Sequence, residues 1–274
     1  MVSSFINLLK TPKTQLGIFL ALIFITAFLN NPSLKVILVF VISILSVASS
    51  DLLFLKLRNI KPFFPSAALV TGSIVGLLTG PSLAWYAPIV IGVIAMFSKN
   101  FVRFSNRHVF NPAAFGLLVG YIIFNQNISW WAVSFQQFSI FNPSTSSGQV
   151  FQFSIPFLIL LSPAFVSLIR MKRYRITLSF LAIYILLNQF LNPKSSILNL
   201  ITDPTILFFS IVMLVEPLTS PNNHIKQILF GVVVALLSIF VSSPIINSQL
   251  SILSLVDPLI FSLLLGNLVF FKFR

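Results

Sequence analysis

The side chains able to do chemistry are few in this chain of 274 residues, which contains four acids, two histidines and no cysteine. Without thiols the chain can form neither disulfides nor thiol-bound iron–sulfur clusters, so any redox role requires an organic cofactor. No carboxylate pair, metal-ligand spacing or nucleophile triad is present, which argues against hydrolytic catalysis. His108 and His224 are both expected at the ends of apolar segments on the same side. A paired-histidine haem site inside a bilayer is therefore not predicted.

Three of the acids, Asp203, Glu216 and Asp257, lie just before or within apolar segments. A carboxylate at such a place is costly unless it has a partner, so each is a candidate functional residue. Asp203 and Asp257 both precede a proline and are equally well explained as helix caps. Glu216 is predicted to bind a cation or accept a proton, although pairing with Lys226 would neutralise it. We predict that Glu216 and Asp257 form an ion pathway.

A further candidate site lies in the stretch Arg103–Gly120, where a basic cluster is followed by an apolar segment with several small residues. Pro112 suits the first turn of a helix, and the Asn111 side chain can accept from the free N–H groups there. Small residues such as Gly116 allow close approach of either another helix or a flat ligand. The pattern alone leaves both interpretations open.

The composition places these residues in a membrane protein. Hydrophobic residues make up 57% of the chain and charged residues 8%, and the mean hydropathy is +1.02. The 17 Lys and Arg residues far outnumber the acids, but they occur in short clusters between apolar runs of membrane-spanning length. This placement indicates membrane topology rather than nucleic-acid binding.

Ten apolar segments predict an all-α polytopic protein with about ten transmembrane helices. They divide into a first five-helix unit over residues 1–124, an external loop over 125–152 and a second five-helix unit over 153–274. The segments are Leu16–Leu29, Val36–Ser49, Ser66–Leu78, Ala84–Phe97, Ala113–Phe124, Phe153–Ile169, Ile176–Leu191, Thr205–Val215, Ile228–Val241 and Pro258–Phe271.

The cations alternate between the connections, as the positive-inside rule requires. Lys and Arg accumulate in every second connection, while the other set has only Lys35 and Lys194. Both termini are therefore expected in the cytoplasm, with the protein in the cytoplasmic (inner) membrane. Trp85, Trp130 and Trp131 fall at predicted outer ends, where an interfacial aromatic belt would place them.

The third and eighth segments are short, interrupted by Pro or Gly, and occupy matching places in the two halves. Val75–Pro81 aligns with Val215–Pro221, and Asn111–Gly120 aligns with Asp257–Gly266 at nearly the same offset. Because each half has an odd number of crossings, the two would form inverted repeats with a site where the broken helices meet. Thr and Ser hydroxyls in these segments are explained either by such a site or by bonds to their own helices.

The motifs His108-Val109-Phe110-Asn111-Pro112-Ala113-Ala114 and Glu216-Pro217-Leu218-Thr219-Ser220-Pro221, following Pro65–Gly72, resemble a known family. It comprises RnfD, the flavin-carrying membrane subunit of Rnf-type electron transport complexes, and NqrB, its counterpart in sodium-pumping NADH:quinone oxidoreductases. The resemblance implies ten helices in two inverted repeats, related to urea and ammonium channels. It also implies partner subunits and electron transfer through flavin, coupled to Na⁺ or H⁺ movement.

The predicted cofactor is FMN or riboflavin. His108 beside Arg107 is explained either by binding a flavin phosphate or an acidic partner, or by a solvated basic cluster. Taken together, the repeat and the resemblance predict the following cofactor-binding residues: Thr71, Gly72, Arg107, His108, Asn111, Pro112, Gly116, Thr219 and Ser220.

The attachment loop departs from the family pattern. Relatives that bind FMN covalently use a Thr in an S-G-A-T sequence after the fifth helix, whereas this loop aligns Ser147–Val150 with that motif. Val150 has no hydroxyl, and Thr145 is a poor substitute in a flexible Ser-rich loop tip. Flavin is therefore expected to be bound non-covalently. The alternative function is a small-solute or ion transporter or channel of related fold without a redox cofactor.

Overall fold

The computed structural model describes residues 11–61, 63–134, 161–193, 196–243 and 256–273. This part of the chain is mostly helical. Four of its helices are long and apolar enough to cross a membrane: α2 (Pro12–Asn30), α3 (Leu34–Leu57), α10 (Tyr174–Leu191) and α13 (His224–Ser242). Together with the shorter apolar helices, they make the chain a polytopic membrane protein, as predicted.

The shorter apolar helices lie in the remaining predicted segments. They are α4 (Ser66–Leu78), α5 (Ala87–Phe101), α6 (Pro112–Ile123), α9 (Ser162–Arg170), α12 (Pro204–Phe208) with the π-helical turn η1 (Phe209–Met213), and α15 (Pro258–Phe270). Five small elements between or after these were not predicted: the strands β1 (Arg103–Phe104) and β2 (Arg107–His108), the helices α7 (Trp131–Ser134) and α11 (Ile197–Thr202), and the 3₁₀ turn η3 (Phe271–Phe273).

Three of the helices begin with the same two-residue signal, an Asn or Asp followed by Pro. Asn111, Asp203 and Asp257 each accept a hydrogen bond from backbone N–H groups in the first turn of α6, α12 and α15. The proline loses nothing there because its position has no helical partner to donate to. The interpretation of Asp203 and Asp257 as helix caps is confirmed.

Helix α3 extends to Leu57, eight residues beyond the predicted end at Ser49. Asp51, which lies in this additional part of the helix, is 1% exposed and accepts from Lys99 Nζ at 2.8 Å and Asn100 Nδ2 at 3.0 Å. Because α5 supplies both partners, the carboxylate can stay inside the helix.

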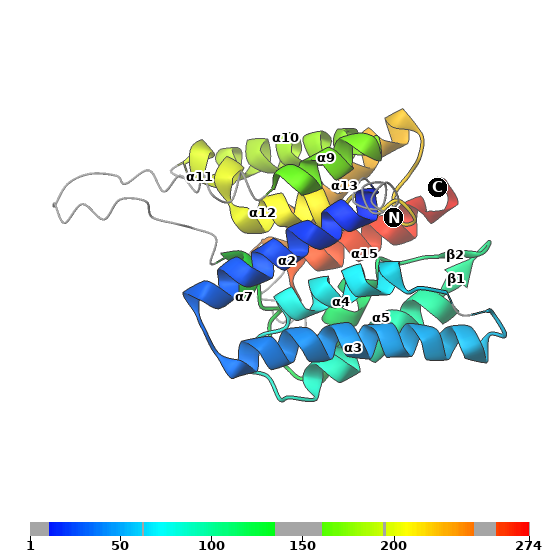
Figure 1. Ribbon diagram of the computed structural model, residues 1–274. Helices are drawn as coiled ribbons and strands as arrows, with labels where there is room; N and C mark the ends of the chain where they lie inside the picture. The colour runs from blue at the N-terminus through cyan, green and yellow to red at the C-terminus, as the bar shows by residue number, and fades with distance from the viewer. Residues whose placement is uncertain (1–10, 62, 135–160, 194–195, 244–255, 274) are drawn as a thin grey trace, which may run out of the picture.

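The helices form two groups that meet along α2 with α9 and α6 with α15. Helices α3, α4, α5 and α6 pack in the first group. In the second, α13 packs against α10 and α15, and η1 packs against α10. The start of α2, the β1–β2 hairpin and η3 lie at one end of the molecule, here called the hairpin end (Figure 1). The connection between α2 and α3 lies at the opposite end (Figure 1).

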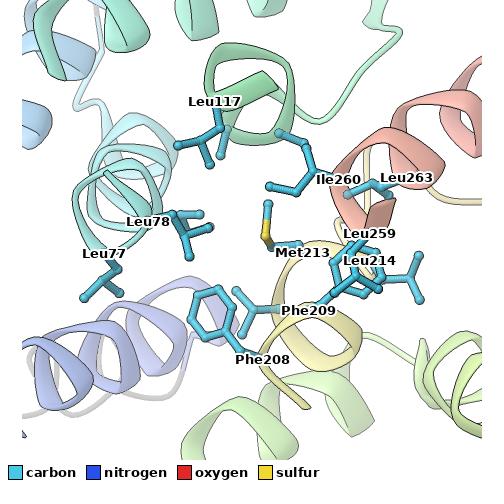
Figure 2. Close-up of a cluster of buried hydrophobic side chains, with 14 of the residues drawn as sticks. Leu77, Leu78, Leu117, Phe208, Phe209, Met213, Leu214, Leu259, Ile260 and Leu263 are labelled. Atoms are coloured by element: carbon cyan, nitrogen blue, oxygen red, sulfur yellow. The ribbon is translucent and has the colours of Figure 1, made fainter. Parts of the chain in front are cut away.

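The region between the groups is filled with apolar side chains. Figure 2 shows Leu78 of α4, Leu117 of α6, Met213 of η1 and Ile260 of α15 pointing toward one another. All four are at most 9% exposed. We refer to these four side chains and their neighbour Phe208 as the central apolar cluster.

The segment predicted as an external loop, 125–152, contains the helix α7. Trp131, Ala132 and Val133 are buried there, against α2, α4 and α12. Trp131 is thus a core residue rather than part of an aromatic belt, whereas Trp85 is 70% exposed, as a belt residue would be. Residues 135–152 of this loop, with Thr145 and Val150, lie outside the described residues.

Candidate functional site

A polar cluster lies at the hairpin end, built from His108, Asn111, Glu216, Thr219 and Asn267. The Nε2 atom of His108 lies 3.2 Å from Glu216 Oε1, and Thr219 Oγ1 donates to Glu216 Oε2 at 3.0 Å. His108 is 4% exposed and Thr219 is fully buried. The side chain of Glu216, by contrast, is 25% exposed. The carboxylate therefore connects the surface with buried polar groups.

Two asparagines join the helices around this cluster. The Asn111 backbone N–H donates to Asn267 Oδ1 at 2.8 Å, and the Asn111 side chain donates to the Met213 carbonyl at 3.0 Å. The Asn267 amide donates in turn to the Thr219 carbonyl at 3.2 Å. The cluster thus links the start of α6, the end of η1 and the last turns of α15.

The chain break at Glu216 follows from the proline after it. A residue before proline is disfavoured in helical conformation, so the helix that ends at Met213 does not resume. The loop instead turns back on the Glu216 carbonyl, which accepts from the backbone N–H groups of Thr219 and Ser220 and from Ser220 Oγ. This turn places the Glu216 and Thr219 side chains beside each other.

Arg173 at the start of α10 stabilises the same loop from outside the cluster. Its guanidinium donates to the carbonyls of Pro217, Ser220 and Pro221 and is 5% exposed. Burial lowers the pKa of this group from its ordinary value, yet a guanidinium remains charged in proteins. Arg173 therefore holds the loop by charge-assisted hydrogen bonds to its carbonyl groups.

Sequence reasoning missed Asn267 and the role of Arg173. Asn267 is a buried amide in an otherwise apolar segment, and this contrast could have marked it as a residue with a specific partner. Arg173 was counted only among the cations that define topology. Of the explanations of His108, the solvated basic cluster is wrong, because the His108 ring is buried against Glu216. Lys226, which the sequence offers as a partner for Glu216, lies with its Nζ atom over the Phe273 ring, 4.2 Å from the ring centroid.

The structure separates Arg107 from His108. The two are neighbours on strand β2, where successive side chains point to opposite faces, and Arg107 is exposed while His108 is buried. Arg107 contributes to a surface pocket beside Phe271 and Lys272. The two residues therefore face different sites.

Four more predicted cofactor residues are placed in helix packing. Thr71 Oγ1 donates to the Ala67 carbonyl of its own helix. A Cβ on Gly72 would lie 2.7 Å from the Ile44 Cα, and one on Gly116 would lie 2.6 Å from the Ile91 carbonyl oxygen. Pro112 is buried in the first turn of α6.

These contacts decide whether a flavin fits among the predicted residues. Helices α3 and α5 occupy the space next to Gly72 and Gly116, so a flat ring does not fit against either glycine in this packing. Thr219 and Ser220 already bond to Glu216, and Asn111 bonds to Met213. Gly72, Gly116, Asn111, Thr219 and Ser220 are thus all engaged in contacts within the protein.

Asp257 lies away from the polar cluster. It caps α15, and its Oδ2 accepts from Trp130 Nε1 at 2.7 Å. In the first half of the chain, Tyr121 Oη donates to the Leu78 carbonyl and accepts from the backbone N–H of Gly80. The two residues of the predicted ion pathway are thus placed in separate polar surroundings.

No curated protein matches this chain. The model of the NQR2, RnfD, RnfE family matches residues 6–270, which is nearly the whole length. The chain therefore belongs to the NQR2, RnfD, RnfE family, as the motifs around Asn111 and Glu216 predicted.

Proposed function

We propose that the protein is the flavin-carrying membrane subunit of an ion-translocating electron transport complex of the Rnf/Nqr type, with Glu216 on the ion path. Family membership supports a role as a membrane subunit in such a multi-protein complex. The observation that carries the ion-path proposal is the Glu216 carboxylate, which is partly exposed and backed by buried polar groups. The inverted repeat, the orientation in the membrane and the bound flavin are parts of the same proposal.

The ion would meet Glu216 first at the hairpin end. Pro217 and Leu218 beside it are exposed, so water and ions reach the carboxylate from that side. A carboxylate within a membrane subunit attracts a cation or a proton. The Thr219 hydroxyl and the backbone carbonyls of the broken chain supply further oxygen atoms behind it, of the kind that bind hard cations.

An inverted five-helix repeat, related in fold to urea and ammonium channels, agrees with the helix contacts. The contacts of α3 with α5 and of α5 with α6 correspond to those of α10 with α13 and of α13 with α15. Tyr121 and Asn267 occupy the same place along α6 and α15, counted from Pro112 and Pro258. Each side chain bonds to the chain just after the short helix of its own half.

The orientation follows from the basic residues. The hairpin end holds Arg103, Arg107 and Lys272, so we place it, with both termini, in the cytoplasm and the protein in the inner membrane. Residues 125–152 would then begin on the outer side. All ten apolar segments would cross or enter the bilayer.

The flavin, FMN or riboflavin, is proposed to be bound non-covalently because Val150 offers no acceptor hydroxyl. Gly72 packs against α3 and Gly116 packs against α5, so we favour a flavin site outside these two helix contacts. The purified protein should then show flavin absorption in the blue, and the flavin should be released by denaturation. If the protein is purified with its complex and this subunit shows no flavin, the proposal that it carries flavin is wrong.

The central apolar cluster weighs against the channel alternative. Its side chains fill the region between the two halves, where an open solute path through a related fold would run. A path for water or a small polar solute requires polar lining or space there. We therefore favour the electron transport role.

The ion path is tested by Glu216→Gln in the complete complex reconstituted into vesicles. Redox-driven uptake of Na⁺ or H⁺ should fall at least tenfold, while assembly and flavin content stay unchanged. Asp203→Asn is the matched control because Asn preserves the cap of α12 while removing an acid elsewhere. Full ion uptake by the Glu216→Gln complex would exclude this residue from the path.

A further inference from the structure

A pocket of about 260 Å³ opens at the hairpin end, apart from the polar cluster. It lies between the β1–β2 hairpin and the turn η3 at the end of α15. The lining consists of two cations, two aromatic rings and two small or aliphatic residues: Phe104, Ser105, Arg107, Val109, Phe271 and Lys272. The pocket thus offers positive charge and apolar surface together.

The walls of the pocket are held in place by specific contacts. Ser105 and Asn106 both have positive φ, 47° and 63°, as the two-residue turn of a tight hairpin requires. The Phe104 ring meets the Phe271 ring edge to face, with centroids 5.1 Å apart. This contact fixes the hairpin against η3, so residues from distant parts of the chain form one site.

The positive charge of the pocket has no acidic side chain of this chain to balance it. All four acids lie in the described residues, and each is committed elsewhere. Asp51 bonds to Lys99, Asp203 caps α12, Glu216 faces His108, and Asp257 caps α15 and accepts from Trp130. The acidic side chains of this chain therefore leave Arg107 and Lys272 open to an anionic ligand.

Exposed apolar side chains lie a few residues along the chain from the lining of the pocket. Phe101 at the end of α5 is 45% exposed, and Leu268 and Val269 in the last turns of α15 are 48% and 58% exposed. In a membrane protein such surfaces face acyl chains. A molecule bound here would therefore meet cations at one end and apolar helix surface at the other.

We propose that this pocket binds the headgroup phosphate of an anionic glycerophospholipid from the leaflet at the hairpin end. Arg107 and Lys272 would contact the phosphate, and the acyl chains would lie on the exposed surfaces of α5 and α15. A basic pocket at the membrane surface suits anionic lipid headgroups. The apolar surroundings favour a lipid over a soluble phosphate compound, because the acyl chains of a lipid can also contact Phe101 and Val269.

The test uses the full-length chain, purified in non-ionic detergent and freed of lipid. Thermal unfolding is followed while dioctanoyl phosphatidylglycerol, dioctanoyl phosphatidylcholine or inorganic phosphate is added. A ligand that binds the folded state raises the unfolding midpoint. We expect phosphatidylglycerol to raise it and the other two compounds to have little effect.

The variant Arg107→Gln/Lys272→Gln should weaken phosphatidylglycerol binding roughly tenfold to thirtyfold at low salt. The control Lys56→Gln/Lys61→Gln removes the same charge from exposed positions outside the pocket and should bind as wild type. If the double pocket variant is unstable without lipid, Lys272→Gln alone should still weaken binding about fivefold.

Four results would overturn the lipid site. Equal effects of the two lipids would show no selectivity for the anionic headgroup, and an equal effect of inorganic phosphate would indicate a free-phosphate site. Equal loss in the control variant would indicate diffuse surface charge. Normal lipid binding by the pocket variant with failed complex assembly would indicate a protein contact. None of these results depends on flavin or ion transport, so the proposed function is tested separately.

Discussion

At the residue scale, several buried polar side chains of this apolar protein have partners far away in the sequence. Asn267 bonds to Asn111 and Thr219, and Asp51 bonds to Lys99 and Asn100. A buried polar group without a partner costs more than the bond itself contributes. These contacts therefore select one arrangement of helices among many that would bury the apolar surface.

Asn267→Leu should destabilise the protein because it leaves the Asn111 N–H and the Thr219 carbonyl without this partner. Each stranded group costs about 1–3 kcal/mol. The thermal unfolding midpoint in detergent should fall clearly below that of Asn188→Leu, whose amide bonds a carbonyl in its own helix. Equal midpoints for the two variants would mean that Asn267 does not hold the cluster together.

Asp51→Ala should destabilise the α3–α5 contact by about 3–5 kcal/mol, since it leaves the largely buried Lys99 ammonium unpaired. Replacing both partners, as Asp51→Leu with Lys99→Met, should recover most of the lost stability. Unfolding of the wild type, the single variants Asp51→Leu and Lys99→Met and the double variant measures the coupling. A double variant no better than Asp51→Leu alone would show that packing, not charge, explains the loss.

At the element scale, the architecture depends on short helices that end at chain breaks and on close contacts between helices. Helix α4 and the α12–η1 pair both stop at a chain break where a polar side chain from the last helix of the same half is bonded. Gly116 allows α6 to lie directly against α5, with Ala95 on the facing side. Small residues act here as contact surfaces between helices.

Gly116→Ala should lower stability by about 1–3 kcal/mol because its methyl group would lie 2.6 Å from both the Ala95 Cβ and the Ile91 carbonyl oxygen. Gly17→Ala is the matched control. A Cβ on Gly17 has no other atom within 4 Å, and Ala favours the helix by up to about 1 kcal/mol. Unfolding measurements should place the two variants on opposite sides of the wild type. Tolerance of Gly116→Ala would show that α5 and α6 can separate at little cost.

At the scale of the whole molecule, the positions of the basic residues and the directions of the helices indicate the same orientation in the membrane. The hairpin lies at the same end as the start of α2 and the end of α15 (Figure 1). Helix α4 leads away from that end, so the turn between α4 and α5 lies toward the opposite end. The structure thus supplies the two ends, and the positive-inside rule assigns a side of the membrane to each.

Single-cysteine labelling checks this assignment, because the chain contains no cysteine of its own. Ser82 and Ser105 are both exposed, one in the α4–α5 connection and one in the hairpin turn. A membrane-impermeant maleimide should label Ser82→Cys on intact spheroplasts and Ser105→Cys only after the membrane is opened. The reverse pattern would invert the whole topology, and labelling of both on intact cells would contradict a membrane between them.

The sequence alone determined the class of protein, its helical segments and its family. Apolar runs must be helical in a bilayer because every backbone group there needs an internal partner, so length and composition already locate the helices. Local signals were equally reliable: Pro112, Pro204 and Pro258 each follow a capping residue, and each begins a helix where predicted. The family motifs around Asn111 and Glu216 also needed no structure to be recognised.

Only the tertiary structure decided which of the predicted residues act together. The sequence could not show that His108 faces Glu216 while its neighbour Arg107 faces Lys272, because strand β2 alternates its side chains and had not been predicted. Nor could it show that Gly116 meets α5 rather than a ligand, since both uses require the same small residue. Contacts between distant segments depend on how whole helices pack, and no local pattern contains that information.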